Sequence, residues 1–215
     1  MMKTVILISG RGSNLEALIA ARDGGALPVD IAAVLSNRPD AAGLATAAAA
    51  GIAACCIDHQ AFAGRDAFDA ALADRIDGFA PDLVVLAGFM RILGDEFVRR
   101  YAGRLMNIHP SLLPSFPGLH THQRALDEGV RIHGCTVHFV TPTLDHGPVI
   151  IQAAVPVLDG DSEATLAARV LRQEHRVYPQ AVRWFAEDRL RLEGGRVRLG
   201  AEMAADAALI APEVR

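Results

Sequence analysis

Cysteine is scarce in this chain, and its three copies form no recognisable pattern. Cys55 and Cys56 are adjacent, Cys135 lies far from them, and none makes a Cys-x-x-Cys pair. An odd count without spaced pairs argues against a disulfide framework and structural zinc, and it favours a reducing compartment. The thiols also lack an evident activating base, so we do not expect a cysteine nucleophile.

Long apolar runs and an excess of positive charge are missing as well. The apolar stretch at Val5–Ile8 is far too short to span a membrane, and the N-terminus lacks a signal-peptide cleavage pattern. The formal net charge of −4 disfavours a general nucleic-acid binder. We therefore expect a cytoplasmic protein, monomer or homodimer, whose partners are small molecules rather than membranes or nucleic acids.

Strands and helices alternate through the first half of the chain. Its 215 residues and 51% hydrophobic content allow one domain. Buried strands are predicted at Val5–Ile8, Val29–Leu35, Ala53–Ile57, Leu83–Leu86 and Leu105–His109. Helices are predicted from Ser13 and over Ala41–Ala50, Arg65–Phe79 and Phe97–Tyr101. This alternation indicates an α/β fold with a doubly wound, mostly parallel sheet.

The pattern changes after Pro110. A proline-rich loop runs to His120, and a helix follows over His122–Glu128. Thr136–Val140 and Val149–Val157 are predicted as antiparallel strands because their connection is short. A long helix over Ser162–Phe185 and a hairpin across Glu193–Gly195 complete residues 1–200, which we expect to form a single domain. Residues 201–215 are alanine-rich and are predicted as a tail of uncertain order.

The segment Ser9–Asn14 joins the first strand to the first helix. Free N–H groups at a helix N-terminus suit a phosphate, and Gly10 and Gly12 allow close approach to the backbone. The spacing matches neither the dinucleotide-binding nor the Walker sequence, and a plain strand-to-helix turn capped by Ser13 is the alternative. Ligands of open α/β sheets bind at the carboxyl ends of strands, which favours a binding site here.

Asn107 and His109 alternate at the end of a strand that Pro110 stops, so their side chains share one face. An amide donor beside a titratable imidazole suits chemistry in which a carbonyl oxygen gains negative charge, such as formyl transfer. A carboxylate at Asp145, in a loop between two strands, would favour the protonated imidazole. The alternative is a buried pair that only satisfies the backbone of a loop.

The segment Gly88–Leu93 follows the fourth strand. It could form the wall of a pocket for a flat heterocycle, but taken alone an ordinary apolar loop that returns to the core is the favoured interpretation. His120 and His122 are spaced like a pair of metal ligands, but no nearby carboxylate or cysteine completes a set, so no metal site is predicted.

Together these segments resemble the phosphoribosylglycinamide formyltransferases, the folate-dependent enzymes of purine synthesis. The resemblance runs from Val5 to about Phe185 and includes Ile8–Leu15, Leu86–Leu93, Asn107–Pro114, Pro117–His122 and Gln173–His175. Asn107–Pro114 is shared with several formyl-folate enzymes, whereas Gly12-Ser13-Asn14 is specific to this branch. The resemblance implies a Rossmann-like formyltransferase fold.

The resemblance also implies roles for individual residues. Asn107 and His109 would stabilise an oxyanion, and Asp145 would raise the pKa of His109 and assist proton transfer. The ribonucleotide 5′-phosphoribosylglycinamide would be held by Gly12, Ser13, Asn14 and Glu174. The donor 10-formyltetrahydrofolate, a co-substrate, would be held by Arg65, Met90, Arg91, Ile92, Leu93, Asn107, Thr141, Pro142, Thr143, Leu144 and Asp145. No metal is implied.

Three rival functions follow from the same segments. Formyltetrahydrofolate hydrolase and methionyl-tRNA formyltransferase share the Asn107–Pro114 segment, but each carries an additional domain for which we expect no room here. A non-catalytic module for phosphorylated metabolites would explain the glycine loop but not the combination of Asn107, His109 and Asp145.

Overall fold

The fold was analysed in a computed structural model that describes residues 1–200 and residue 211. The prediction for the tail at 201–215 therefore lies, apart from residue 211, outside the described residues. The helices are α1 (Ser13–Asp23), α2 (Ala42–Ala49), α3 (Arg65–Asp77), α4 (Asp95–Arg100), α5 (Thr121–Asp127) and α6 (Glu163–Ala186). The strands are β1 (Met2–Ile8), β2 (Val29–Ser36), β3 (Ala53–Cys56), β4 (Leu83–Leu86), β5 (Leu105–His109), β6 (Ile132–Phe139), β7 (Val149–Pro156), β8 (Leu190–Glu193) and β9 (Arg196–Leu199).

Seven strands form one sheet in the order β3-β2-β1-β4-β5-β6-β7. The pairs from β3 to β5 are parallel, whereas β6 pairs antiparallel with β5 and β7 antiparallel with β6. The predicted doubly wound, mostly parallel sheet with an antiparallel C-terminal portion is therefore confirmed. No helix among the described residues is long and apolar enough to cross a membrane.

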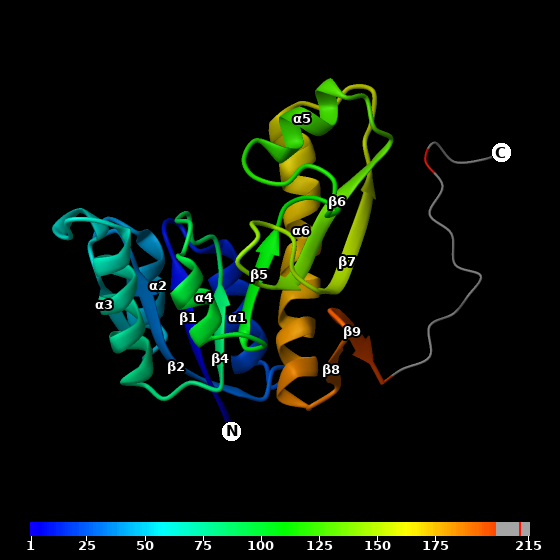
Figure 1. Cartoon of the computed structure of the whole chain (residues 1–215). Coiled ribbons are helices and arrows are strands. Elements are labelled where there is room, and N and C mark those ends of the chain that lie inside the picture. Colours follow the sequence, from blue (N-terminus) through cyan, green and yellow to red (C-terminus); the bar gives the residue numbers. More distant parts are fainter. Residues whose placement is uncertain (201–210, 212–215) are drawn as a thin grey trace.

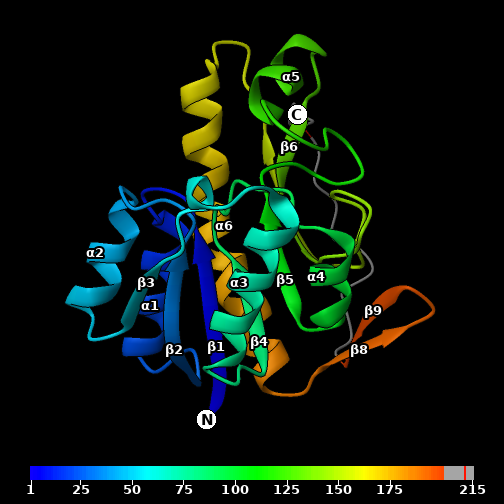
Figure 2. The same cartoon turned by 60° about the vertical axis from the view of Figure 1, so that its left-hand side comes forward.

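Successive side chains of β1 point to opposite faces of the sheet and contribute to the hydrophobic core on both sides. Val5 and Leu7 pack in a cluster with α3 and α4, and Ile6 and Ile8 pack in a second cluster with α1 and α6. All four side chains are fully buried, and each stabilises the fold by about 1.5–3 kcal/mol relative to an exposed side chain. Figures 1 and 2 show α3 and α4 on one face of the sheet and α1 and α6 on the other.

The strand order reverses between β1 and β4. The chain moves outward from β1 to β2 and β3, then returns to place β4 on the other side of β1. An open α/β sheet binds its ligands at such a reversal, outside the carboxyl ends of the strands. The loop after β1 and the segment Gly88–Leu93 after β4 therefore meet where both were predicted to bind ligands.

Three local features differ from, or add to, the predicted elements. Strand β6 begins at Ile132 rather than Thr136, because its first residues pair with the far end of β7. A 3₁₀ helix at His59–Ala61 was not predicted; Asp58 caps it by accepting the N–H of Gln60. The predicted hairpin is confirmed as β8 and β9, which Gly194 and Gly195 join with positive φ angles.

Candidate active site

His109 and Asp145 are brought together from two different connections of the sheet. His109 ends β5, and Asp145 lies in the loop between β6 and β7. Nδ1 of the imidazole is 3.5 Å from Oδ2 of the carboxylate, and both side chains are less than a tenth exposed. The same oxygen accepts a hydrogen bond of 2.8 Å from the N–H of Gly118. The carboxylate is therefore held in place by the loop that follows β5.

The other ring nitrogen of His109 also faces an acceptor. Nε2 lies 3.1 Å from the carbonyl oxygen of Phe116. An imidazolium has two N–H donors, whereas a neutral imidazole has one donor and one acceptor. An oxygen atom therefore lies opposite each of the two ring nitrogens.

Asn107 is oriented by a histidine that sequence reasoning missed. His138 lies opposite Asn107 in the antiparallel register of β5 and β6. Its Nδ1 donates to the carbonyl of Phe139 at 3.0 Å, which leaves Nε2 to accept from the amide nitrogen of Asn107 at 3.3 Å. Burial lowers the pKa of His138, so the ring stays neutral and keeps its acceptor. The only signal for His138 in the sequence was its position on a predicted strand.

The loop that carries Asp145 depends on two backbone conformations. Asp145 has a φ of 49°, a left-handed conformation that is uncommon for residues other than glycine. A Cβ atom on Gly147 would lie 1.6 Å from the carbonyl oxygen of Phe139, so only glycine allows this approach. Strained backbone of this kind is typical of functional sites, where surrounding contacts hold it.

The loop before α1 presents backbone N–H groups at the switch point of the sheet. Gly12 is the N-cap with a φ of 82°, and no side chain among the described residues caps the helix there, so the predicted Ser13 or Asn14 cap is wrong. The N–H of Gly43, on α2, donates to the carbonyl of Gly10 at 3.1 Å. A Cβ on Gly43 would lie 2.6 Å from Ile8, so this close packing needs glycine. Contacts with α2 thus hold the loop in place, and the backbone N–H groups at the start of α1 remain available to a ligand.

The side chain of Asn14 is directed toward α6. Its amide nitrogen donates to Oε2 of Glu174 at 2.7 Å, and both residues are buried. Burial raises the pKa of Glu174, and the hydrogen bond from Asn14 partly opposes that shift. Oδ1 of Asn14 has no hydrogen-bond partner within residues 1–200 and 211. Two of the four residues predicted to hold the ribonucleotide are therefore in direct contact with each other.

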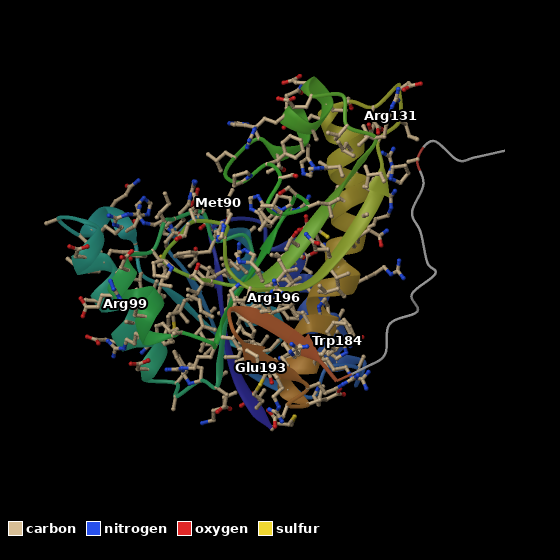
Figure 3. The ribbon with its side chains drawn as sticks, turned by 45° about the vertical axis from the view of Figure 1, so that its right-hand side comes forward. Met90, Arg99, Arg131, Trp184, Glu193 and Arg196 are labelled. Atoms are coloured by element: carbon tan, nitrogen blue, oxygen red, sulfur yellow. The ribbon has the colours of Figure 1, made fainter. Side chains whose placement is uncertain are left out.

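Apolar side chains stand exposed on both segments predicted to bind folate. Met90 and Ile92 follow β4, Leu144 precedes Asp145, and each is more than half exposed. Figure 3 shows Met90 where the α3 and α4 side of the molecule meets the α5 side. The guanidinium of Arg91 lies 5.1 Å from the ring centroid of Phe68, and its buried Nε has no partner in the described part of the chain. Exposed apolar groups beside an unpaired donor are typical of a ligand site.

The remaining predicted residues lie around these segments. Leu93 is partly buried against the core, and Arg65 begins α3 with its side chain exposed. The hydroxyl of Thr141 donates to the carbonyl of Thr143 at 3.3 Å within the Asp145 loop, which also contains Pro142. Both sides of the predicted folate site therefore end close to the histidine and its carboxylate.

Comparisons with known proteins agree with this geometry. A family described as formyl transferase matches residues 2–182. The chain belongs to the formyl transferase family. A phosphoribosylglycinamide formyltransferase from Escherichia coli is 56% identical over 89% of this chain and 90% of its own length. One from Haemophilus influenzae is 45% identical over 90% and 91%.

A solved structure gives the same result. The crystal structure of glycinamide ribonucleotide transformylase 1 from Symbiobacterium toebii has a TM-score of 0.90 at 50% identity, covering 93% of this chain and 94% of that one. The prediction that the chain is a formyl-group transferase resembling these enzymes is confirmed.

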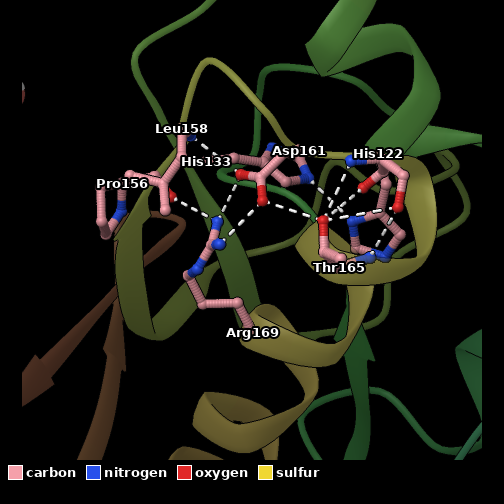
Figure 4. Close-up of polar contacts among 8 residues, drawn as sticks. His122, His133, Pro156, Leu158, Asp161, Thr165 and Arg169 are labelled. Atoms are coloured by element: carbon pink, nitrogen blue, oxygen red, sulfur yellow. Dashed lines mark hydrogen bonds and ion pairs between the residues drawn. The ribbon is translucent and has the colours of Figure 1, made fainter.

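In this formyl transferase, one of the two histidines that were considered as metal ligands, His122, contacts a different histidine. Nδ1 of His122 lies 3.2 Å from Nε2 of His133, and burial lowers the pKa of both rings, that of His133 to about 4. Figure 4 shows the neighbouring Asp161 engaged by Arg169 and Thr165. Among the described residues no group of three or more His, Cys, Asp or Glu side chains could hold a metal ion.

Two of the three cysteines of this formyl transferase have raised pKa values. Cys135 is fully buried, and burial raises the pKa of its thiol to about 12. Cys56 is exposed on the edge strand β3, where partial burial, followed by Asp58 and Asp40, raises its pKa. Both groups are therefore thiols rather than thiolates near neutral pH, which disfavours nucleophilic chemistry at either.

Proposed function

We propose that this chain transfers the formyl group of 10-formyltetrahydrofolate to the primary amine of 5′-phosphoribosylglycinamide. The observation that carries the proposal is the contact between His109 and Asp145 beside Asn107, at the carboxyl ends of parallel strands in a formyl transferase. The names of its relatives supply the ribonucleotide acceptor, and the folate donor is what the resemblance to this family implies.

The reaction needs one bond to form and one to break at the formyl carbon. The amine nitrogen attacks this carbon, and the carbonyl oxygen becomes an oxyanion. The bond from the carbon to N10 then breaks, the amine loses one proton, and N10 gains one. Asn107 and His109 each offer an N–H donor to the oxyanion. One such donor is worth roughly 10²–10³ in rate, or about 2.7–4 kcal/mol.

His109 can make its contribution without losing its contact with Asp145. Nδ1 faces the carboxylate, and Nε2 faces the carbonyl of Phe116. The formyl oxygen would replace this carbonyl as the acceptor while Asp145 continues to stabilise the positive ring. The same pair can pass the proton from the amine to N10 through water, a role worth about 10²–10⁴ in rate.

The loop before α1 supports binding of the ribonucleotide. Gly12, Ser13 and Asn14 offer N–H groups at the positive end of a helix that carries no side-chain cap among the described residues. Because the Asn14 amide nitrogen is committed to Glu174, its contribution to the phosphate would come from its backbone N–H. The free Oδ1 of Asn14 and the carboxyl of Glu174 suit ribose hydroxyl groups.

The segments on either side of His109 support binding of the folate. Exposed Met90, Ile92 and Leu144 offer apolar surface to the pterin, and Arg65 and Arg91 offer positive charge to its carboxylates. The other members of this proposed site are Leu93, Asn107, Thr141, Pro142, Thr143 and Asp145. Binding both substrates beside one histidine supplies proximity as well.

A transfer assay tests the proposal directly. Purified protein is incubated with 10-formyltetrahydrofolate in the presence and absence of the ribonucleotide, and formylated product and free formate are both measured. We expect product only with both substrates, and a loss of at least about 10² in rate for His109→Ala. Formate released without the ribonucleotide would instead indicate a hydrolase, and binding without turnover would indicate a non-catalytic module.

A further inference from the structure

Ser9 lies between the two proposed substrate sites and contacts the backbone of both. It follows β1 directly and precedes the Gly10–Asn14 loop. Its N–H donates to the carbonyl of Gly88 at 3.1 Å, and its hydroxyl oxygen accepts the N–H of Met90 at 2.7 Å. Two hydrogen bonds from one residue therefore fix the start of the folate segment against the start of the phosphate loop.

The hydroxyl of Ser9 has a second partner that fixes its direction. It donates to Oδ1 of Asn37 at 2.5 Å, so its single proton is committed and its oxygen is free to accept from Met90. Ser9 and Asn37 are both more than nine-tenths buried. Asn37 follows β2 and is held in turn by His59, whose Nδ1 lies 2.8 Å from its carbonyl oxygen. The chain of contacts thus ties together the ends of β2, β1 and β4.

The backbone on the folate side is shaped to reach this hydroxyl. Gly88 has a φ of 76°, which turns the chain so that the Met90 N–H points back to Ser9 while the Met90 side chain is 71% exposed. On the phosphate side, only Gly10 and Arg11 separate Ser9 from the N-cap Gly12. A shift in either segment therefore strains a short, buried hydrogen bond that the other segment shares.

We propose that Ser9 is a positioning residue that couples the two substrate sites, so that a ribonucleotide on the Gly12–Asn14 loop orders the Met90 backbone for the folate donor. This inference rests on the function proposed above. A hydroxyl that only satisfied buried backbone would protect the Met90 N–H equally with and without ribonucleotide. Coupling predicts instead that a ligand bound at one loop changes the protection of backbone N–H groups in the other.

Hydrogen exchange at the Met90 amide measures this coupling. The wild-type protein and Ser9→Ala are compared with and without saturating glycinamide ribonucleotide, with no folate present. In the wild type we expect the ribonucleotide to slow Met90 exchange by about fivefold or more, the lower end of typical coupling between sites. In Ser9→Ala we expect exchange that is already fast and does not respond to the ribonucleotide.

Ser36→Ala is the matched control. It removes a fully buried hydroxyl at the end of the neighbouring strand, where the Ser36 hydroxyl forms hydrogen bonds with the backbone of Arg38. We expect Ser36→Ala to keep the wild-type response at Met90. Steady-state kinetics add a second readout, because Ser9→Ala should raise KM for both substrates, whereas Ser13→Ala should raise KM for the ribonucleotide alone.

Asn37→Ala keeps the inference testable if Ser9→Ala fails to fold. It removes the acceptor that directs the Ser9 hydroxyl, and it should weaken the response at Met90 in the same sense. An unchanged Met90 amide on ribonucleotide binding to the wild type, or a Ser9→Ala protein that behaves like Ser36→Ala, overturns the coupling role. Absence of formyl transfer in the wild type would instead refute the proposed function, so the two failures are distinguishable.

Discussion

Nδ1 of His109 lies 3.5 Å from Oδ2 of Asp145, although the two residues belong to different connections of the sheet. The carboxylate is buried, and the Gly118 N–H holds it by donating a hydrogen bond to the same oxygen. A charge fixed at this distance in a site with little water interacts strongly with the ring. The contact therefore places a carboxylate directly beside one ring nitrogen of His109.

Replacing Asp145 with asparagine removes this charge and little else. The new side-chain oxygen can still accept from Gly118, so the loop should keep its position. We expect kcat to fall by about 10² or more and the pH–rate profile to change, while ribonucleotide affinity stays near the wild-type value. Steady-state kinetics across pH and calorimetric titration measure these effects. An unchanged rate and pH profile would show that the charge has no catalytic role.

His138 offers a second test, because it acts on Asn107 rather than on a substrate. His138→Phe fills a similar volume but leaves the Asn107 amide nitrogen without its acceptor at Nε2. We expect kcat to fall by roughly 10-fold to 10²-fold with little change in either KM, because the oxyanion donor loses its fixed direction. His138→Gln can restore an acceptor and should recover part of the rate. Equal rates for the two variants would argue against this positioning role.

The sequence predicted what depends on local pattern. Apolar runs such as Val5–Ile8 and Leu83–Leu86 indicated buried parallel strands, and the sheet confirms them. The order of strands then placed the loops after β1, β4 and β5 at one edge. The contact between Asp145 and His109 was a hypothesis from residue chemistry, because a carboxylate in a loop between two strands would favour a protonated imidazole. Strand order alone does not place this loop, since β6 runs antiparallel to β5.

The sequence did not predict what depends on register and helix packing. His138 faces Asn107 only because β5 and β6 pair in one particular register, and the long connection between them, which contains α5, does not fix that register. Asn14 contacts Glu174 only because α1 packs against α6, and no periodicity encodes that pairing. The additional residues of β6 likewise follow from pairing with β7 rather than from their own composition.

Because of the contact between Asn14 and Glu174, variants of the phosphate loop can distinguish effects on ribonucleotide binding from effects on unfolding free energy. Asn14→Ala removes the donor to a buried carboxyl, so we expect a loss of about 1–3 kcal/mol in unfolding free energy together with weaker ribonucleotide binding. Ser13→Ala removes a side chain that makes no such buried contact and should weaken binding with little change in stability. Urea unfolding and ribonucleotide titration distinguish these outcomes. If neither variant binds the ribonucleotide more weakly, the loop is not the phosphate site.

The lowered pKa of His133 predicts how the unfolding free energy changes at acidic pH. Burial, followed by His122, lowers its pKa from 6.5 to about 4 in the folded protein, so the unfolded chain binds a proton more readily. Stability from this group is then complete above about pH 6.5 and is lost as the pH falls toward 4, by roughly 2–3 kcal/mol. His133→Gln should lose this dependence, so the difference in unfolding free energy between wild type and variant should change between pH 7 and pH 4. The difference cancels contributions from other groups, such as Glu174, whose raised pKa acts in the opposite direction. A difference that stays constant over this range would show that the His133 ring is not held in its neutral form.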